Sequence, residues 1–180
     1  AESTVFGARA GDTAAAEWAA RPLLPWPDAL AAEIEHRTLA PFTRETGEDP
    51  YAVRDALRDL MWEHVGLMRT ETGLRRAVTE IERLHERATA LCVRGGPAFN
   101  PEWQVALDVQ NMLTVAEFVT RAALLRDESR GSHYRADHPL PDDARWLRNI
   151  YVQRGPGDSG LLWTEPVRFT RLAPPGTDSR

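Results

Sequence analysis

The segment at residues 101–127 is apolar on nearly every side of the helix that it predicts, and this restricts the possible folds more than any other feature. Asn100 is a favoured N-cap and Pro101 suits the first helical position, so a helix begins here. A helix that is apolar on most sides is buried on most sides. We therefore expect two partner helices and a third cover, which is either the chain's first helix or a domain outside this sequence. The narrow polar stripe consists of Gln110, Thr114, Glu117 and Arg121.

Two amphipathic segments supply the partner helices. Residues 50–69 and residues 74–92 each carry apolar side chains at helical spacing. Residues 70–73 separate the first from the second, and the glycine-rich residues 94–97 end the second. These periods predict a mainly α fold built on a three-helix bundle that is spectrin-repeat-like.

Elements of a different character flank the bundle. Two short segments, residues 147–154 and 161–170, are rich in β-branched and aromatic residues and enclose a glycine-rich turn, which predicts a C-terminal β-hairpin. Pro166 cannot donate to a ladder, so we expect its strand at an edge. Before the bundle we expect a preceding helix at residues 2–20, a proline-broken linker at 21–27, a short helix at 28–39 and a loop at 41–49.

Composition is that of an ordinary soluble globular protein. Of the 180 residues, 42% are hydrophobic and 27% charged, and the net charge of −5 argues against a nucleic-acid partner. No apolar run reaches the roughly 18 residues of a membrane span, and the first residues lack the basic start of a signal peptide. We therefore expect a cytoplasmic protein. The lone Cys92 excludes an internal disulfide, and we expect it to fill the core at the end of the second helix.

The sequence has no strong motif for catalysis or for metal binding. His133, Asp137 and His138 match no common zinc spacing, and no phosphate loop, nucleophile elbow or dinucleotide-binding glycine pattern occurs. His64 and His85 lie among charged residues on separate predicted helices, where surface or interhelical hydrogen bonds are the expected role. We predict neither a catalytic residue nor a metal ligand in this chain.

The most polar stretch is the arginine corner, which we define as residues 126–139, RDESRGSHYRADHP. It follows the end of the apolar helix, where unpaired carbonyl groups attract cations that Arg126 and Arg130 can supply. Gly131 can adopt a positive φ and turn the chain sharply. Arg130 and Arg135 carry planar forks suited to carboxylates or carbonyls. The candidate site residues are Arg126, Glu128, Ser129, Arg130, Gly131, His133, Arg135 and Asp137.

Three roles for the arginine corner follow from these residue types. The first is a helix cap followed by a salt-bridged loop. The second is an interdomain or subunit-docking corner, and the third is direct binding of substrate. The helix cap with a salt-bridged loop is the expected role. Docking is the functional alternative, because a rigid docking surface needs such a density of charge and a solvated loop does not.

Several sequence motifs, in the same order along the chain, resemble those of one family. Residues 128–139 match the pattern ESRG-small-H-x-R-x-D-x-P, which ends the third helix in the C-terminal helical domain of succinate dehydrogenase and fumarate reductase flavoprotein subunits. In the first helix Met61, Trp62, Val65, Gly66 and Arg69 fit the usual M-W-x-x-V-G followed by an arginine. Residues 99–113 resemble the start of the third helix, and residues 1–11 resemble the helix after the flavin-contact turn. Residues 165–167 resemble the R-P-V of the closing hairpin, although Glu165 stands where the family has arginine.

This resemblance implies a parent protein that carries FAD, interconverts succinate and fumarate, and passes electrons to an iron–sulfur subunit located at a membrane. The hydride-transfer groups would lie upstream, so this chain by itself would hold no cofactor and be inactive. The implied partners are the upstream FAD domain, the membrane anchor and the iron–sulfur subunit, with the parent peripheral on the cytoplasmic membrane face. The implied division is a terminal helix of the FAD domain at 1–20, a linker and short helix at 21–49, the three-helix bundle and arginine corner at 50–146, the β-hairpin at 147–172 and a disordered tail at 173–180.

Two other assignments compete with this one. L-Aspartate oxidase has a similar corner that usually reads H-Y-T-x-D, so Arg135 favours the succinate and fumarate branch. An autonomous helical interaction module without a redox role is the other alternative. If the upstream domain is absent, the first helix should expose Val5, Phe6 and Trp18, and the chain could form a homo-oligomer.

Overall fold

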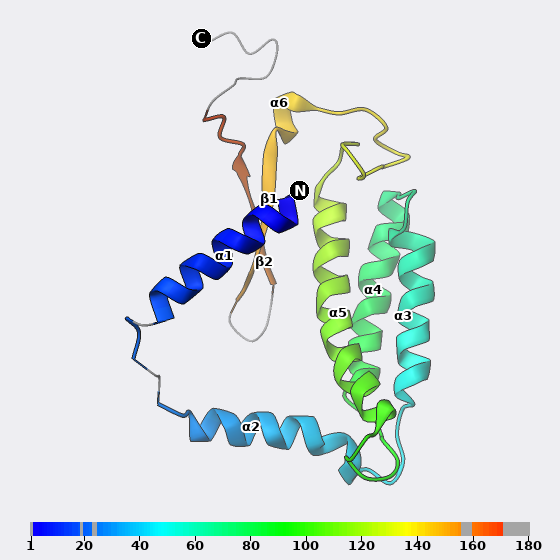
Figure 1. Cartoon of the computed structure of the whole chain (residues 1–180). Coiled ribbons are helices and arrows are strands. Elements are labelled where there is room, and N and C mark those ends of the chain that lie inside the picture. Colours follow the sequence, from blue (N-terminus) through cyan, green and yellow to red (C-terminus); the bar gives the residue numbers. More distant parts are fainter. Residues whose placement is uncertain (1, 19, 23–24, 156–159, 171–180) are drawn as a thin grey trace. The chain divides into compact units, whose positions relative to one another are not determined.

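The computed structural model describes residues 2–18, 20–22, 25–155 and 160–170, and the chain divides into two compact units, Ala1–Arg37 and Thr38–Arg180 (Figure 1). The first unit holds α1 (Glu2–Trp18) and most of α2 (Asp28–Leu39). The predicted first helix is therefore present, and Val5, Phe6 and Trp18 on it are 50%, 61% and 72% exposed. No residue of α2 is buried.

Three helices form the core of the second unit, as the periodicity predicts. They are α3 (Pro50–Val65), α4 (Glu71–Ala88) and α5 (Pro101–Leu125), and each packs against the other two (Figure 1). Asn100 caps α5 as expected, because its side chain accepts a hydrogen bond from the Trp103 amide. The fold is thus mainly α with a C-terminal hairpin. The main core cluster contains Val53, Leu57, Ile81, Leu84, Ala88, Leu91, Val93, Ala106, Val109, Leu113 and Ala116.

The ends of α3 and α4 differ from the predicted 50–69 and 74–92. α3 ends at Val65, where Gly66 turns so tightly that an added Cβ would lie 2.6 Å from the Trp62 carbonyl oxygen. α4 begins at Glu71 because the Thr70 side chain accepts a hydrogen bond from the Gly73 amide at 3.1 Å. Residues 70–73, expected to separate the helices, thus form the N-cap and first turn of α4.

α4 stops at Ala88, so the predicted extension of this helix to Cys92 is wrong. Leu91 instead forms a parallel bridge with Glu48, and the Cys92 amide donates to the Glu48 carbonyl at 3.0 Å. Gly47 lies against this bridge, because an added Cβ would be 2.3 Å from the Ala90 carbonyl oxygen. Part of the predicted loop at residues 41–49 also differs, since a 3-10 helix, η1, occupies Ala40–Thr43.

The C-terminal hairpin pairs β1 (Arg148–Arg154) with β2 (Gly160–Pro166) in antiparallel register, after a one-turn helix, α6 (Asp143–Trp146), that was not predicted. β2 ends at Pro166, whereas the expected strand continued to residue 170, and Pro166 closes the ladder. Tyr151 and Trp163 stack on one face of the hairpin with ring centroids 5.4 Å apart. Residues 156–159 of the expected turn and the expected tail, 173–180, lie outside the described residues.

The apolar helix α5 is covered on its inner face and only in part elsewhere. Its end follows the prediction closely, at Leu125 instead of residue 127. Gly160 of β2 lies against the Phe118 ring, since an added Cβ would be 2.1 Å from Phe118 Cε1. Val115 and Val119 remain 60% and 45% exposed, so the third cover predicted for this helix is incomplete in the second unit. Among the described residues, no helix combines the length and apolarity needed to cross a membrane.

Candidate functional site

The candidate site residues meet in one hydrogen-bonded loop between α5 and α6. The loop turns at residues 130–133, where the Arg130 amide donates to the His133 carbonyl at 2.8 Å and the His133 amide donates to the Arg130 carbonyl at 3.0 Å. Gly131 has the predicted positive φ of 59° and Ser132 does not, which is the pattern of a type II′ turn. Glycine therefore sets the direction in which the following side chains point.

Glu128 is a fully buried carboxylate at the centre of the arginine corner. Arg130 donates two hydrogen bonds to it, at 2.8 and 2.9 Å, and Arg126 donates one at 2.5 Å. The Asp142 amide donates a fourth at 2.7 Å. Burial by itself would raise the pKa of Glu128, but the hydrogen bonds from Arg130, the Asp142 amide and Arg126 outweigh it and lower the pKa to about 2. The carboxylate is thus held ionised and fully bonded.

Arg135 caps the C-terminus of α5 from inside the protein. Its side chain is 1% exposed, and Nη1 donates to the carbonyl oxygens of Ala123 at 3.2 Å, Leu124 at 3.4 Å and Arg126 at 3.2 Å. Arg126 and Arg130, which were predicted for this role, bond to Glu128 instead, so that prediction is wrong. Those two side chains are drawn away by Glu128, and the turn at Gly131 brings Arg135 back under the helix end instead.

Asp137 joins Arg135 to the start of α4. The carboxylate accepts two parallel hydrogen bonds from Arg135, at 2.8 and 2.9 Å, and one from the Glu71 amide at 2.7 Å. The bonds from Arg135 hold the pKa of Asp137 well below its usual value; burial opposes this, and the Glu71 amide adds to it. One ion pair therefore satisfies the N-terminus of one helix and the C-terminus of another.

His133 connects the arginine corner to the end of α3. Its Nδ1 lies 3.2 Å from Arg69 Nη1, and its Nε2 lies 3.2 Å from the Arg126 carbonyl oxygen. These partners assign the hydrogen to Nε2. Burial lowers the pKa of His133; the hydrogen bond to Arg126 opposes this, and the Arg69, Arg126 and Arg135 charges add to it, so the ring is neutral. The Arg69 backbone also pairs with the arginine corner, at Tyr134 and Ala136.

Two further candidate residues hold the ends of the loop. Ser129 accepts a hydrogen bond from the Arg135 amide at 2.9 Å and donates to the His138 carbonyl at 2.7 Å. Arg126 donates to the carbonyl oxygens of Trp146 at 3.2 Å and Arg148 at 2.6 Å, and its guanidinium lies 4.9 Å from the centre of the Trp146 ring. The arginine corner thus also positions α6 and the first residue of β1.

Sequence reasoning missed several partners of these residues. Arg69 was noted only as part of the family wording, and its distance of 64 residues from His133 gave no local sign of contact. Asp143, which accepts from Arg130 at 2.6 Å, and Trp146, which donates to Asp127, belong to the unpredicted α6. The aspartate pair at residues 142–143 followed by an aromatic residue was the available signal, since Asp142 caps that turn.

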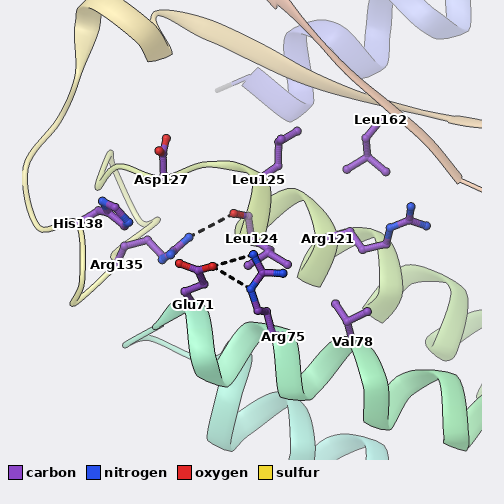
Figure 2. A pocket seen from close by; sticks show the side chains of 10 residues that line it. All are labelled: Glu71, Arg75, Val78, Arg121, Leu124, Leu125, Asp127, Arg135, His138 and Leu162. Carbon is purple, nitrogen blue, oxygen red and sulfur yellow. Dashed lines mark hydrogen bonds and ion pairs between the residues drawn. The ribbon is translucent and has the colours of Figure 1, made fainter.

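An open pocket of about 650 Å³ lies beside the arginine corner, between α4, α5 and β2 (Figure 2). Of the candidate residues only Arg135 lines it. Arg75 in this pocket is paired with Glu71 at 2.7 Å and Arg121 with Glu117 at 2.7 Å. No group of three or more metal-ligating side chains occurs in the described part of the chain. The full lining is Glu71, Arg75, Val78, Arg121, Leu124, Leu125, Asp127, Arg135, His138 and Leu162.

The chemistry of the arginine corner is that of a structural joint. Its buried charges, Glu128 and Arg135, are matched by partners within this part of the chain. Such pairing favours the helix-cap role among the three interpretations, because a substrate would have to displace strong internal ion pairs. The outward surface of the same loop carries Ser132, Tyr134 and Ala136, all exposed.

Comparisons with known proteins agree with this architecture. Residues 54–179 match the family model described as the fumarate reductase flavoprotein C-terminal region. The chain is 37% identical over 154 residues to a subunit of the fumarate reductase (CoM/CoB) of Methanothermobacter marburgensis, covering 86% of this chain and 28% of the relative. It is 36% identical over 184 aligned residues to the fumarate reductase flavoprotein subunit of Mycobacterium tuberculosis, covering 97% of this chain and 31% of the relative.

A solved structure shares both the fold and the sequence. The Sdh1 complex of Mycobacterium smegmatis in its apo form contains a chain that superposes with a TM-score of 0.83 at 36% identity. That match covers 91% of this chain and 29% of the other. The present chain therefore spans less than a third of the proteins that it matches here. From the family model and these relatives, the chain belongs to the fumarate reductase flavoprotein C-terminal family.

Proposed function

We propose that this chain is the C-terminal part of an FAD-dependent flavoprotein that interconverts succinate and fumarate. Within that protein its own role is structural: it supports the flavin-binding part and offers a surface for a neighbouring subunit. The match of residues 54–179 to the family carries the proposal. The similarity to Sdh1 supports it, because 36% identity extends over 91% of the chain with a TM-score of 0.83.

The flavin is assigned to the upstream part of the parent. A dinucleotide is held by a parallel sheet with a glycine-rich turn, whereas the described residues form only a two-stranded antiparallel hairpin. The described residues therefore do not form this dinucleotide-binding fold, and we derive no catalytic step from them. The parent would pass electrons to an iron–sulfur subunit that is linked to a membrane anchor. The parent itself would lie on the cytoplasmic face of that membrane.

The proposed division of labour follows the sequence. Residues 1–20 would be the terminal helix of the FAD domain and residues 21–49 the connection to the bundle. Residues 50–146 would be the bundle with the arginine corner, followed by the hairpin at 147–172. In this scheme the internal ion pairs make the arginine corner rigid, and its exposed residues, Ser132, Tyr134 and Ala136, form the docking surface for the iron–sulfur subunit.

The activity is tested on the full-length flavoprotein. We expect bound flavin, dye reduction with succinate and oxidation of a reduced viologen with fumarate. The relatives named above are fumarate reductases and an Sdh1 protein, which favours this activity over L-aspartate oxidation. Oxidation of L-aspartate without turnover of succinate or fumarate would contradict the proposal.

The docking role needs a variant that spares the internal network. Tyr134 is 40% exposed, and only its backbone joins the network, so Tyr134→Ala should leave the melting temperature of the flavoprotein unchanged. We expect it to reduce recovery of the iron–sulfur subunit in a pull-down of the complex. Met68→Ala, which removes a side chain that is 70% exposed, is the matched control. If Tyr134→Ala and the unchanged protein recover equal amounts of the iron–sulfur subunit, the docking role is contradicted.

A further inference from the structure

Phe99 combines two features that are each unusual for a large aromatic residue. Among the described residues it is the only non-glycine with a positive φ, 52°, and its relative exposure is 105%. The left-handed region is costly for a bulky side chain, because Cβ approaches the following carbonyl oxygen. Full exposure of the ring provides no compensating burial. Backbone strain of this kind persists only where the surroundings enforce it.

The turn that carries Phe99 is firmly attached to α5. Asn100 Nδ2 donates to the carbonyl oxygens of Arg94 at 2.7 Å and Gly96 at 2.9 Å, while its Oδ1 accepts from the Trp103 amide at 3.1 Å. The Arg94 amide donates to Glu102 at 2.9 Å. These bonds fix the backbone on both sides of Phe99. The ring is therefore presented at a defined position, outside the bundle and away from the core.

Phe99 lies at the end of the bundle where the preceding polypeptide arrives. The second unit begins at Thr38, whose carbonyl accepts a hydrogen bond from Trp103 Nε1 at 2.8 Å. A few residues later, the Pro41 carbonyl accepts a hydrogen bond from the Val93 amide at 3.1 Å. The Phe42 ring packs edge-on against Trp103, with the ring centroids 5.4 Å apart. Figure 1 shows the connection from α4 to α5 and the start of α3 at this same end, with the arginine corner at the other.

We propose that Phe99 is an anchor that inserts into an apolar pocket of the upstream FAD-binding part of the same polypeptide. This rests on the proposed function, in which the remaining two thirds or more of the parent precede this chain. A single aromatic side chain in a desolvated pocket is a common centre of an interface. The flanking Pro97 and Ala98 are exposed and uncharged, which fits an apolar pocket whose rim carries no countercharge. Burial of the ring compensates the strain.

The test uses substitutions for which release of backbone strain and loss of ring burial predict opposite changes in melting temperature. In the full-length flavoprotein, Phe99→Gly and Phe99→Asn both remove the ring and both tolerate a positive φ. If the ring is seated in a pocket, both variants melt at a lower temperature than the unchanged protein. Tryptic cleavage after Arg37, between the two units, should then be faster by roughly tenfold or more. Phe99→Leu should retain part of the contact, and Leu67→Ala, which truncates a side chain that is 80% exposed, should change neither quantity.

Three results would overturn the anchor. An unchanged or higher melting temperature for Phe99→Gly means that only strain was released and the ring faces water. A loss that depends on protein concentration means that a second copy covers the ring, and a loss confined to the assembled complex means that another subunit does. Because melting is measured without substrate, a parent that fails to turn over fumarate contradicts the proposed function while this comparison still decides the role of Phe99.

Discussion

Arg135 and Asp137 form a doubly hydrogen-bonded ion pair, at 2.8 and 2.9 Å, through which the end of α5 is joined to the start of α4. The guanidinium bonds to the last carbonyls of α5, and the carboxylate bonds to the first amide of α4. Each side chain complements the partial charge of its helix end and the charge of the other side chain. The capping of each helix end therefore depends on the ion pair between the two side chains.

Removing Arg135 should therefore be among the most damaging single changes in the arginine corner. Arg135→Met keeps the volume but leaves Asp137 and three carbonyls without their partner, which should reduce the free energy of unfolding by about 3–5 kcal/mol. Chemical denaturation measures this. Arg145→Met, which removes a surface pair with Asp127 in the same region, is the control and should have little effect. Similar losses of unfolding free energy for the two variants would show that the buried position of Arg135 does not strengthen its contribution to stability.

Stability should fall in acid through Glu128. The folded protein keeps this carboxylate ionised down to about pH 2, whereas the unfolded chain protonates it near the ordinary pKa of 4.5. Between these values the unfolded state binds more protons, so the stabilisation is complete above about pH 4.5 and is lost as the pH falls toward 2. Melting temperature against pH should be flatter in Glu128→Gln over this range. An unchanged slope, with Glu63→Gln as the exposed control, would contradict this assignment.

A side chain at Gly131 should strain the backbone without creating a clash. An added Cβ would have no neighbour within 4 Å, yet the φ of 59° is costly for any β-branched residue. We expect Gly131→Val to lower the free energy of unfolding by about 1–3 kcal/mol. Gly96→Val is the matched control, because that glycine also has open space and no positive φ. Equal stability of the two variants would mean that the turn rearranges freely.

The hairpin should be sensitive to the close approach of Gly160 to Phe118. Gly160→Ala places a methyl group 2.1 Å from Phe118 Cε1, so the ring or the strand must move, at about 1–3 kcal/mol. The double variant Gly160→Ala with Phe118→Ala should recover part of this loss relative to the sum of the single changes. A double-mutant cycle by thermal unfolding measures the coupling. Strict additivity would show that the hairpin does not rest on α5 at this point.

Local rules predicted much of the fold because they act over a few residues. Asn100 as N-cap, the apolar stripes and the glycine at the corner were all readable from spacing alone. The errors arose where two local signals competed. At residues 70–73 the cap formed by Thr70 prevailed over Gly73 as a helix breaker, and beyond Ala88 pairing with Glu48 prevailed over continued helical spacing.

The candidate site was predictable as a set of residues but not as a set of contacts. Three arginines lie in the ten positions that follow the end of α5, and sequence proximity favoured Arg126 and Arg130 as caps. Arg135 caps the helix for two reasons. The turn at Gly131 directs the chain back toward the end of α5, and Glu128 attracts the side chains of Arg126 and Arg130. The contribution of Arg69 depends on how α3 packs, which no local pattern encodes.

The long sequence separation between Asp137 of the arginine corner and its partner Glu71 has a consequence for the order of folding. The bond from the Glu71 amide to Asp137 spans 66 residues and requires α4 and α5 to be in place already. We expect a contact of this kind to form after the main folding barrier, in which case it affects the rate of folding little and the rate of unfolding strongly. The contact between Glu71 and Asp137 would then help to determine how long each folded molecule persists, which is a kinetic role.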